Sequence, residues 1–79
     1  MRTIIRFSVD GEVNSALRNK LSGRLTRAGF VRLPNTATYE HANIDEGDLA
    51  TAIAGFLRAA NNHAGAGRLD HFWLYSDRQ

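Results

Sequence analysis

The sequence predicts an α+β fold in which strands and helices follow the order strand, helix, strand, strand, helix, strand. Two stretches near the ends of the chain, 3–10 and 68–77, are rich in β-branched and aromatic residues and alternate between two faces. Two stretches between them, 13–28 and 45–60, carry apolar residues at spacings of three and four, as amphipathic helices do. Two shorter strand-like segments, on either side of Pro34-Asn35, lie between these helices.

The first strand has one apolar face and one half-polar face, because successive side chains of a strand point to opposite sides. The apolar face carries Thr3, Ile5, Phe7 and Val9, and the second face carries Ile4, Arg6, Ser8 and Asp10. We expect the first face to lie in the core. The second could face water, a partner or a ligand.

The helix predicted over Val13–Ala28 has an apolar stripe formed by Leu17, Leu21, Leu25 and Ala28. Asp10 or Asn14 is the expected N-cap, and Gly29 stands where a left-handed residue ends a helix. Gly23 inside the helix suggests that something packs closely there. A second stripe, formed by Lys20, Arg24 and Arg27, is either a solvated face or a surface that follows phosphates.

The segments 30–33 and 36–42 form the predicted hairpin, since the Pro34-Asn35 connection is short. Asp45 is the expected N-cap of the second helix. The last strand, Arg68–Asp77, has Leu69, His71, Trp73 and Tyr75 on one face and Asp70, Phe72, Leu74 and Ser76 on the other. Both faces are substantially apolar, which favours a central strand or one covered on both sides.

This order is the ferredoxin-like βαββαβ plan, a four-stranded antiparallel sheet with two helices on one face, formed by residues 1–79 as one domain. The other face is open. It would carry Arg6, Ser8, His71, Trp73 and Tyr75. Such a face could stack bases or cover itself with a second copy, and the second interpretation makes His71, Trp73 and Tyr75 interface residues.

Composition narrows the class of protein. The chain has no cysteine, so a disulfide framework is excluded, and its 43% hydrophobic fraction is that of a globular protein. The net charge of +2 permits contact with phosphate without requiring it. No apolar run approaches the ~20 residues of a membrane span, and no signal peptide is evident. We expect a cytoplasmic protein that forms a homodimer through sheet edges or open sheet faces, because so small a core gives little stability alone.

Ser8 and Asp10 are the candidate catalytic residues. They lie two apart on one face, and across a two-fold axis Asp10 could hold Mg²⁺ or Mn²⁺ between subunits. The competing interpretation makes Asp10 a helix cap. The three histidines are isolated in the sequence, and Asp70 and His71, as neighbours on a strand, should point to opposite faces.

The whole pattern resembles a superfamily of small ferredoxin-like proteins that includes the CRISPR-associated adaptation nucleases and the virulence-associated protein D toxins, with related antitoxins. The matching segments are the opening strand Ile4-Ile5-Arg6-Phe7-Ser8-Val9, the helix from Arg18 to Leu25, Ala28-Gly29-Phe30 and the hairpin Thr38-Tyr39-Glu40-His41. The nucleases of this family place an aspartate after the aromatic residue of the first strand. Ser8 stands there in this chain, so the resemblance implies a non-catalytic member.

These observations predict a small homodimeric protein that binds nucleic acid and is not an enzyme. The cationic residues expected to contact DNA or RNA are Arg6, Arg18, Lys20, Arg24, Arg27 and Arg32. One alternative is a protein-binding module, such as a toxin–antitoxin component or a phage-type inhibitor, acting through the aromatic face. A second is a metal-dependent endonuclease. No cofactor is expected apart from Mg²⁺ or Mn²⁺ in that last case.

Overall fold

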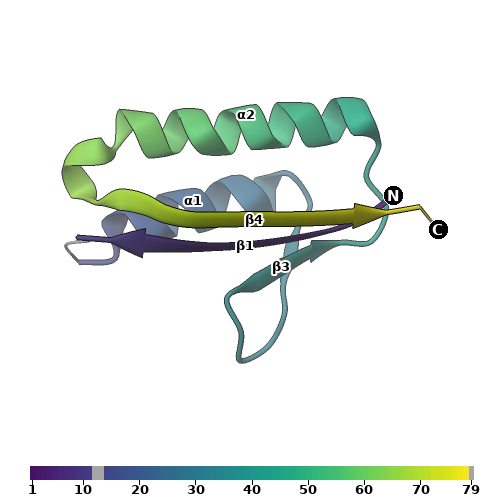
Figure 1. Ribbon diagram of the computed structural model, residues 1–79, viewed down its shortest axis with the longest axis horizontal. Coiled ribbons are helices and arrows are strands. Elements are labelled where there is room, and N and C mark those ends of the chain that lie inside the picture. The colour runs from purple at the N-terminus through teal and green to yellow at the C-terminus, as the bar shows by residue number, and fades with distance from the viewer. Residues whose placement is uncertain (12–13, 79) are drawn as a thin grey trace.

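Strand β1 (Arg2–Asp10) lies inside a four-stranded antiparallel sheet and pairs on both sides. Its neighbours are β3 (Thr38–His41) and β4 (Arg68–Asp77) (Figure 1). Strand β2 (Val31–Arg32) pairs with the far side of β3. The strand order is β2-β3-β1-β4. The computed structural model describes residues 1–11 and 14–78.

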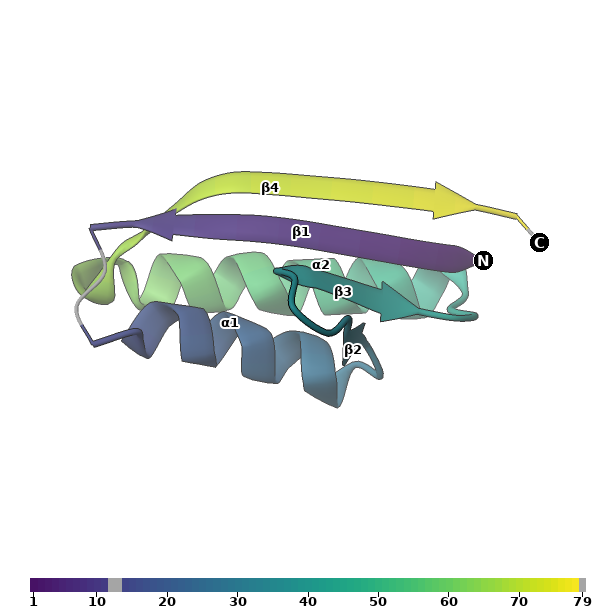
Figure 2. The same cartoon turned by 90° about the horizontal axis from the view of Figure 1, so that it is seen from below.

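Both helices cover the same face of this sheet (Figure 2). They are α1 (Ala16–Arg27) and α2 (Glu46–Asn62), and a short 3₁₀ helix, η1 (Ala64–Ala66), leads from α2 to β4. In the described part of the chain, no helix covers the other face of the sheet. This is the ferredoxin-like α+β arrangement that the order of elements predicts.

The core lies between the sheet and the helices. Its fully buried side chains include Ile5 of β1, Leu17, Leu21 and Leu25 of α1, Phe30, and Phe56 of α2. Phe56 contacts the rings of Phe7 and Phe72, each with its centroid 5.1 Å away. The predicted core face of β1 is therefore confirmed.

The start of α1 differs from the prediction. The helix begins at Ala16, and Val13 lies outside the described residues. Ser15 holds the N-cap position in a left-handed conformation, with φ of 58°, and makes no side-chain cap. Asp10 instead accepts a hydrogen bond from the Gly11 amide at 2.9 Å, so neither Asp10 nor Asn14 is the cap of this helix. A turn with successive positive φ angles at Asn14 and Ser15 carries the chain into the helix instead.

The glycine predictions have opposite outcomes. Gly29 ends α1 with φ of +94°, and its amide donates to the Thr26 carbonyl at 3.0 Å, as expected of a left-handed terminating residue. Gly23 has no atom within 4 Å of the position its Cβ would occupy. The predicted close packing at Gly23 is therefore wrong.

The start of α2 is as predicted. The Asp45 carboxylate accepts a hydrogen bond from the Asp48 amide at 2.7 Å, which caps the helix. Glu46 and Asp48 add acidic groups to its first turn, where they complement the positive end of the helix dipole.

Strand β4 has the predicted bounds but not the predicted place. It is an edge strand, because only β1 pairs with it in the described sheet. A β-bulge also shifts its register: Ser8 lies opposite His71, but Val9 lies opposite Leu69. The additional residue, Asp70, returns Leu69 to the core side, where it packs against the core cluster. Alternation predicted that Leu69 shares a face with His71, Trp73 and Tyr75, and this prediction is wrong.

Candidate nucleic-acid interface

The open sheet face presents two stacked aromatic rings on β4. Trp73 and Tyr75 lie two residues apart with ring centroids separated by 6.2 Å and an interplanar angle of 10°. Trp73 is 51% exposed and Tyr75 is 45% exposed, which is unusual for rings of this size. Across the sheet, Arg6 lies opposite Trp73 and Ile4 lies opposite Tyr75. The predicted composition of this face is thus confirmed.

The two arginines of β1 on this face have different environments. The Arg2 Nε atom donates to Glu40 of β3 at 2.7 Å, and its Nη1 atom lies 3.6 Å from Asp77 of β4. The hydrogen bond to Glu40 raises the pKa of Arg2 above its ordinary value. Within the described residues, Arg6 forms no ion pair, and its side chain is exposed. Arg6 is therefore the arginine of this face that can meet an external anion.

Ser8, His71 and Asp70 form a contact that alternation did not predict. The bulge brings Asp70 Oδ2 to 2.8 Å from His71 Nδ1, although neighbours on a regular strand would point apart. Ser8 Oγ lies 3.3 Å from the same nitrogen. In a catalytic triad the carboxylate and the hydroxyl engage opposite nitrogens of the imidazole. Because both engage Nδ1 here, Ser8 is not activated as a nucleophile.

Two adjoining cavities extend the open face toward α1. The first, of about 350 Å³, is lined by Arg6, Phe7, Ser8, Ala37, His71 and Trp73. The second, of about 280 Å³, is lined by Phe7, Ser8, Arg18, Asn19, Ser22, Arg32, Ala37 and Tyr39. They share Phe7, Ser8 and Ala37. A hollow lined by an aromatic ring and an arginine therefore lies next to a hollow rich in hydroxyl, amide and guanidinium groups.

Four elements build the second cavity. Arg18, Asn19 and Ser22 come from successive turns of α1, and Arg32 comes from β2. Tyr39 of β3 closes its base, where its hydroxyl and that of Ser22 form a hydrogen bond of 2.5 Å. Arg32 is oriented by a hydrogen bond from its Nε atom to the Thr36 carbonyl at 2.9 Å. Asn19, Ser22 and Tyr39 were not predicted as site residues, since only the tertiary fold brings them beside Arg18 and Arg32.

The predicted stripe on α1 lies elsewhere. Lys20, Arg24 and Arg27 line a separate hollow of about 470 Å³ between α1 and α2, together with Ala16, Asn19, Gly23, Ala59 and His63. The six cationic residues predicted from the sequence thus divide into two groups. Arg6, Arg18 and Arg32 line the two adjoining cavities, and Lys20, Arg24 and Arg27 line the hollow between α1 and α2.

The candidate catalytic pair is not brought together in one cavity. Ser8 lines the two hollows described above, whereas Asp10 lines another hollow of about 250 Å³ beside Arg68. The bulge between Ser8 and Val9 separates their surroundings. Among residues 1–11 and 14–78, no three His, Cys, Asp or Glu side chains form a group suited to a metal ion.

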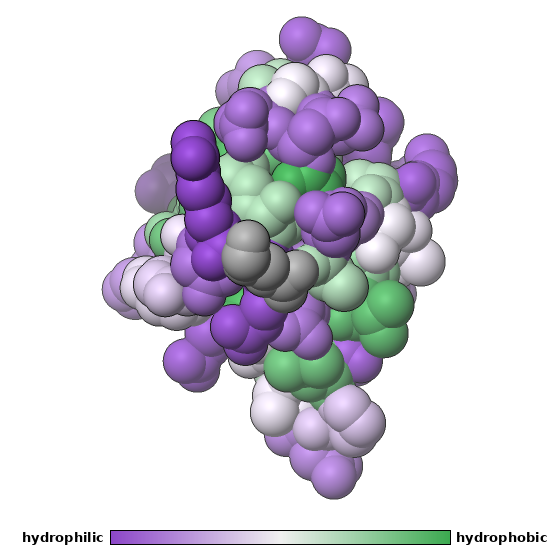
Figure 3. Space-filling model, turned by 90° about the vertical axis from the view of Figure 1, so that its right-hand side faces the viewer, coloured by the Kyte–Doolittle hydropathy of each residue, from purple (hydrophilic) through white to green (hydrophobic). Residues whose placement is uncertain are grey.

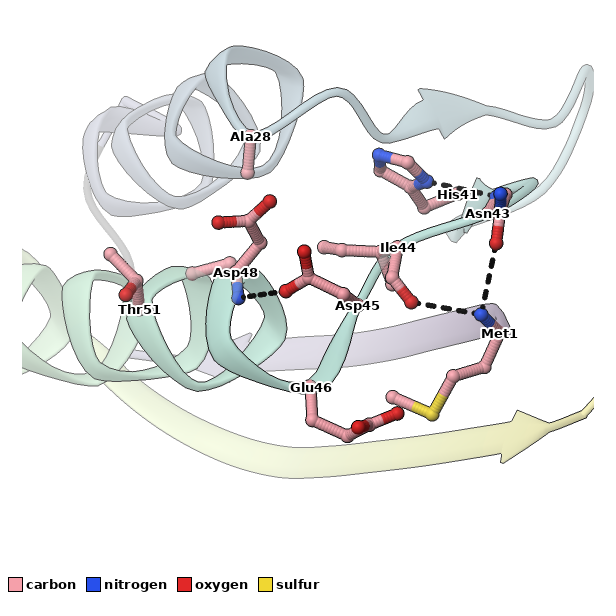
Figure 4. Close-up of a pocket in the computed structure, with 10 residues that line it drawn as sticks. Met1, Ala28, His41, Asn43, Ile44, Asp45, Glu46, Asp48 and Thr51 are labelled. Carbon is pink, nitrogen blue, oxygen red and sulfur yellow. Dashed lines mark hydrogen bonds between the residues drawn. The ribbon is translucent and has the colours of Figure 1, made fainter.

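A further hollow, larger than those described above, has the wrong charge for a nucleic acid. It measures about 500 Å³ and lies where the start of α2 meets the end of α1 and the amino terminus. Asp45, Glu46 and Asp48 line it, and the Met1 ammonium group donates to the Asn43 side chain and the Ile44 carbonyl (Figure 4). Seen from this end, the surface is mostly hydrophilic with separate apolar patches (Figure 3). Carboxylates in this position repel phosphate.

Comparisons with known proteins add no relative. No protein-family model matches the chain, and no curated protein matches it. In the described part of the chain, neither helix has the length and apolar character that crossing a membrane demands.

Proposed function

We propose that the protein binds single-stranded nucleic acid along the surface formed by the two adjoining cavities. The observation that carries the proposal is that exposed Trp73 and Arg6 line one cavity, and that Arg18 and Arg32 line a second cavity with which it shares Phe7, Ser8 and Ala37. On this proposal the chain is a non-catalytic relative of the ferredoxin-like nucleases that its sequence resembles.

The aromatic part of the surface suits unpaired bases. Trp73 and Tyr75 expose ring area on a sheet, and stacking of a base on such a ring contributes ~1–3 kcal/mol. A duplex keeps its bases stacked on one another, so it cannot use these rings. The surface therefore favours a single strand.

The cationic part suits the phosphates of the same strand. Arg6 lies beside Trp73, and Arg18 and Arg32 border the neighbouring cavity with hydroxyl and amide groups. Guanidinium groups bind phosphate through paired hydrogen bonds, and hydroxyl groups can add further ones. The sugar-phosphate backbone of a nucleic acid that passes over Ser8 and Ala37 would contact these guanidinium, hydroxyl and amide groups one after another.

Binding of labelled oligonucleotides, followed by fluorescence anisotropy, tests the proposal. We expect single-stranded RNA or DNA to bind more tightly than a duplex of the same sequence. Trp73→Ala should weaken binding by roughly 1–3 kcal/mol through lost stacking. Arg32→Ala should weaken it for all sequences alike, because a phosphate contact reads no base.

Matched controls separate this surface from general electrostatic attraction. Arg58→Ala removes the same charge from an exposed position of α2 outside both cavities, so it should leave affinity nearly unchanged. Arg24→Ala tests the stripe on α1. If Arg24→Ala weakens binding and Trp73→Ala does not, the strand follows the stripe and the proposal is wrong.

The aromatic face favours one other function, a protein-binding module such as a toxin–antitoxin component. That function predicts a partner whose affinity depends on Trp73 and Tyr75 but changes little with salt, since apolar contacts are not screened. Absence of oligonucleotide binding even at low salt would favour this second function.

A further inference from the structure

The sheet has two edges of very different length. β2 forms one edge with two residues, and β4 forms the other with ten. Figure 2 shows β4 as the outermost strand on its side of the sheet. An edge strand presents unpaired N–H and C=O groups, and natural proteins protect it by shortness, charge, proline or a bulge. β2 is protected by its shortness.

Most of β4 lacks such protection. Arg68 and the bulge at Asp70 mark its first residues, but the segment 71–76, His-Phe-Trp-Leu-Tyr-Ser, contains no Lys, Arg, Asp, Glu or Pro. Two of its side chains, those of Trp73 and Tyr75, are large, apolar and about half exposed. A segment of this composition pairs readily with another strand.

We propose that β4 pairs with β4 of a second copy of this chain. The two strands run antiparallel about a two-fold axis through Leu74, and they join two four-stranded sheets into one continuous sheet. This inference rests on the edge of the sheet and not on the proposed binding of nucleic acid.

The amino-acid sequence of β4 is self-complementary in this register. With Leu74 opposite Leu74, each Trp73 lies opposite Tyr75 of the other copy on the open face. Each His71 then lies opposite Asp77 of the other copy, so an imidazole faces a carboxylate. Aromatic pairs and pairs of polar opposites are the cross-strand contacts that stabilise antiparallel sheets.

Neighbouring registers lose this match. An axis through Trp73 would put Asp77 opposite Leu69, which the bulge turns into the core. An axis through Tyr75 would put Trp73 opposite Asp77, a carboxylate against an apolar ring. The axis must pass through a residue, because an axis between two residues would place core-facing residues opposite residues of the open face.

Pairing at the edge leaves the open face accessible. The rings of Trp73 and Tyr75 would meet those of the second copy side by side, so the two open faces become one surface with four aromatic rings across the seam. This arrangement differs from a dimer in which the two open faces cover each other.

Cysteine cross-linking tests the register, because the chain has no cysteine of its own. Opposite residues of paired strands have Cβ atoms about 4.5–5.5 Å apart and diagonal residues about 7–8 Å, so only opposite residues approach disulfide distance. We would prepare Trp73→Cys and Tyr75→Cys as separate proteins. Under mild oxidation, mixing them should give far more covalent dimer than either protein gives alone.

Sedimentation equilibrium of the unaltered protein supplies a second measurement, which does not depend on the variants folding or dimerising. A concentration-dependent dimer is expected. A monomer at all concentrations up to the millimolar range overturns the proposal. So does a dimer in which Trp73→Cys cross-links with itself as well as it does with Tyr75→Cys, because that pattern indicates another register or face-to-face packing.

Discussion

Two hydroxyl groups, those of Thr3 and Ser76, satisfy each other at the edge of the core. Thr3 is fully buried, and its Oγ1 atom lies 2.7 Å from the Oγ atom of Ser76 on the neighbouring strand. Ser76→Ala leaves the Thr3 hydroxyl without this partner, and we expect a loss of ~1–3 kcal/mol in the free energy of unfolding. Urea denaturation measures it. Adding Thr3→Val should recover much of the loss, and a double variant no more stable than Ser76→Ala would contradict this account.

Gly29 and Gly23 give opposite predictions for the same substitution. At Gly29, φ is +94° and a Cβ atom would lie 2.9 Å from His41 Nε2, a nitrogen of a ring that accepts a hydrogen bond from the Asn43 amide. Gly29→Ala should therefore destabilise by at least the ~1–2 kcal/mol that a left-handed conformation costs a residue with a Cβ. Gly23→Ala meets no atom within 4 Å in the helix interior and should stabilise by roughly 0.5–1 kcal/mol. Thermal unfolding of both variants compares them directly.

At the scale of the elements, α2 stabilises the fold through one face. Phe56 is fully buried between Phe7 and Phe72, whereas its neighbour Leu57 is 44% exposed. Phe56→Ala should cost ~3–5 kcal/mol through lost burial and the cavity left behind, a large part of the stability of so small a domain. Leu57→Ala is the matched control and should change stability far less. Equal losses in chemical denaturation would show that α2 does not pack as described.

The bulge in β4 makes a prediction about deletions. Removing Asp70 should preserve the fold, because Leu69 then directly precedes His71 in regular alternation and both keep their present faces. Removing Trp73 should be far more damaging, since a shift by one residue would turn His71 toward the core and Phe72 toward water. Amide NMR spectra and the cooperativity of unfolding distinguish the two deletions. A folded Trp73 deletion would show that the register is weakly specified.

At the scale of the whole molecule, the cationic residues form two groups, one lining the two adjoining cavities and one lining the hollow between α1 and α2. Binding through Arg6, Arg18 and Arg32 should give a plot of log affinity against log salt with a slope near about −2, since each phosphate contact on a single strand contributes about −0.7. Arg6→Ala with Arg32→Ala should reduce the slope to about one third, while Lys20→Ala with Arg27→Ala should leave it unchanged. The opposite result would show that the nucleic acid binds along Lys20, Arg24 and Arg27 instead.

Local signals in the sequence predicted most of the fold. Asp45 and the apolar spacing after it fixed the start of α2, and the two faces of β1 followed from alternation. The edge position of β4 could not be predicted from the sequence, because Trp73 and Tyr75 are large aromatic residues of the kind expected in a covered strand, although here they are about half exposed. The bulge could not be predicted either, since Leu69 to Tyr75 alternate without interruption in the sequence. Arg18 and Arg32 were predicted singly, but their common cavity depends on how the hairpin packs against α1.

The pairing of β1 with β4 also bears on how fast the chain folds. Arg2 lies opposite Asp77, so the central strand reaches its longest partner only when nearly the whole chain has closed into a loop. Non-local pairings of this kind slow folding, because the entropy of loop closure is lost before the contacts form. Helical segments α1 and α2 can form earlier from local contacts. We therefore expect refolding to be slower than for a helical bundle of equal length, and substitutions in β1 to slow it more than substitutions in β2.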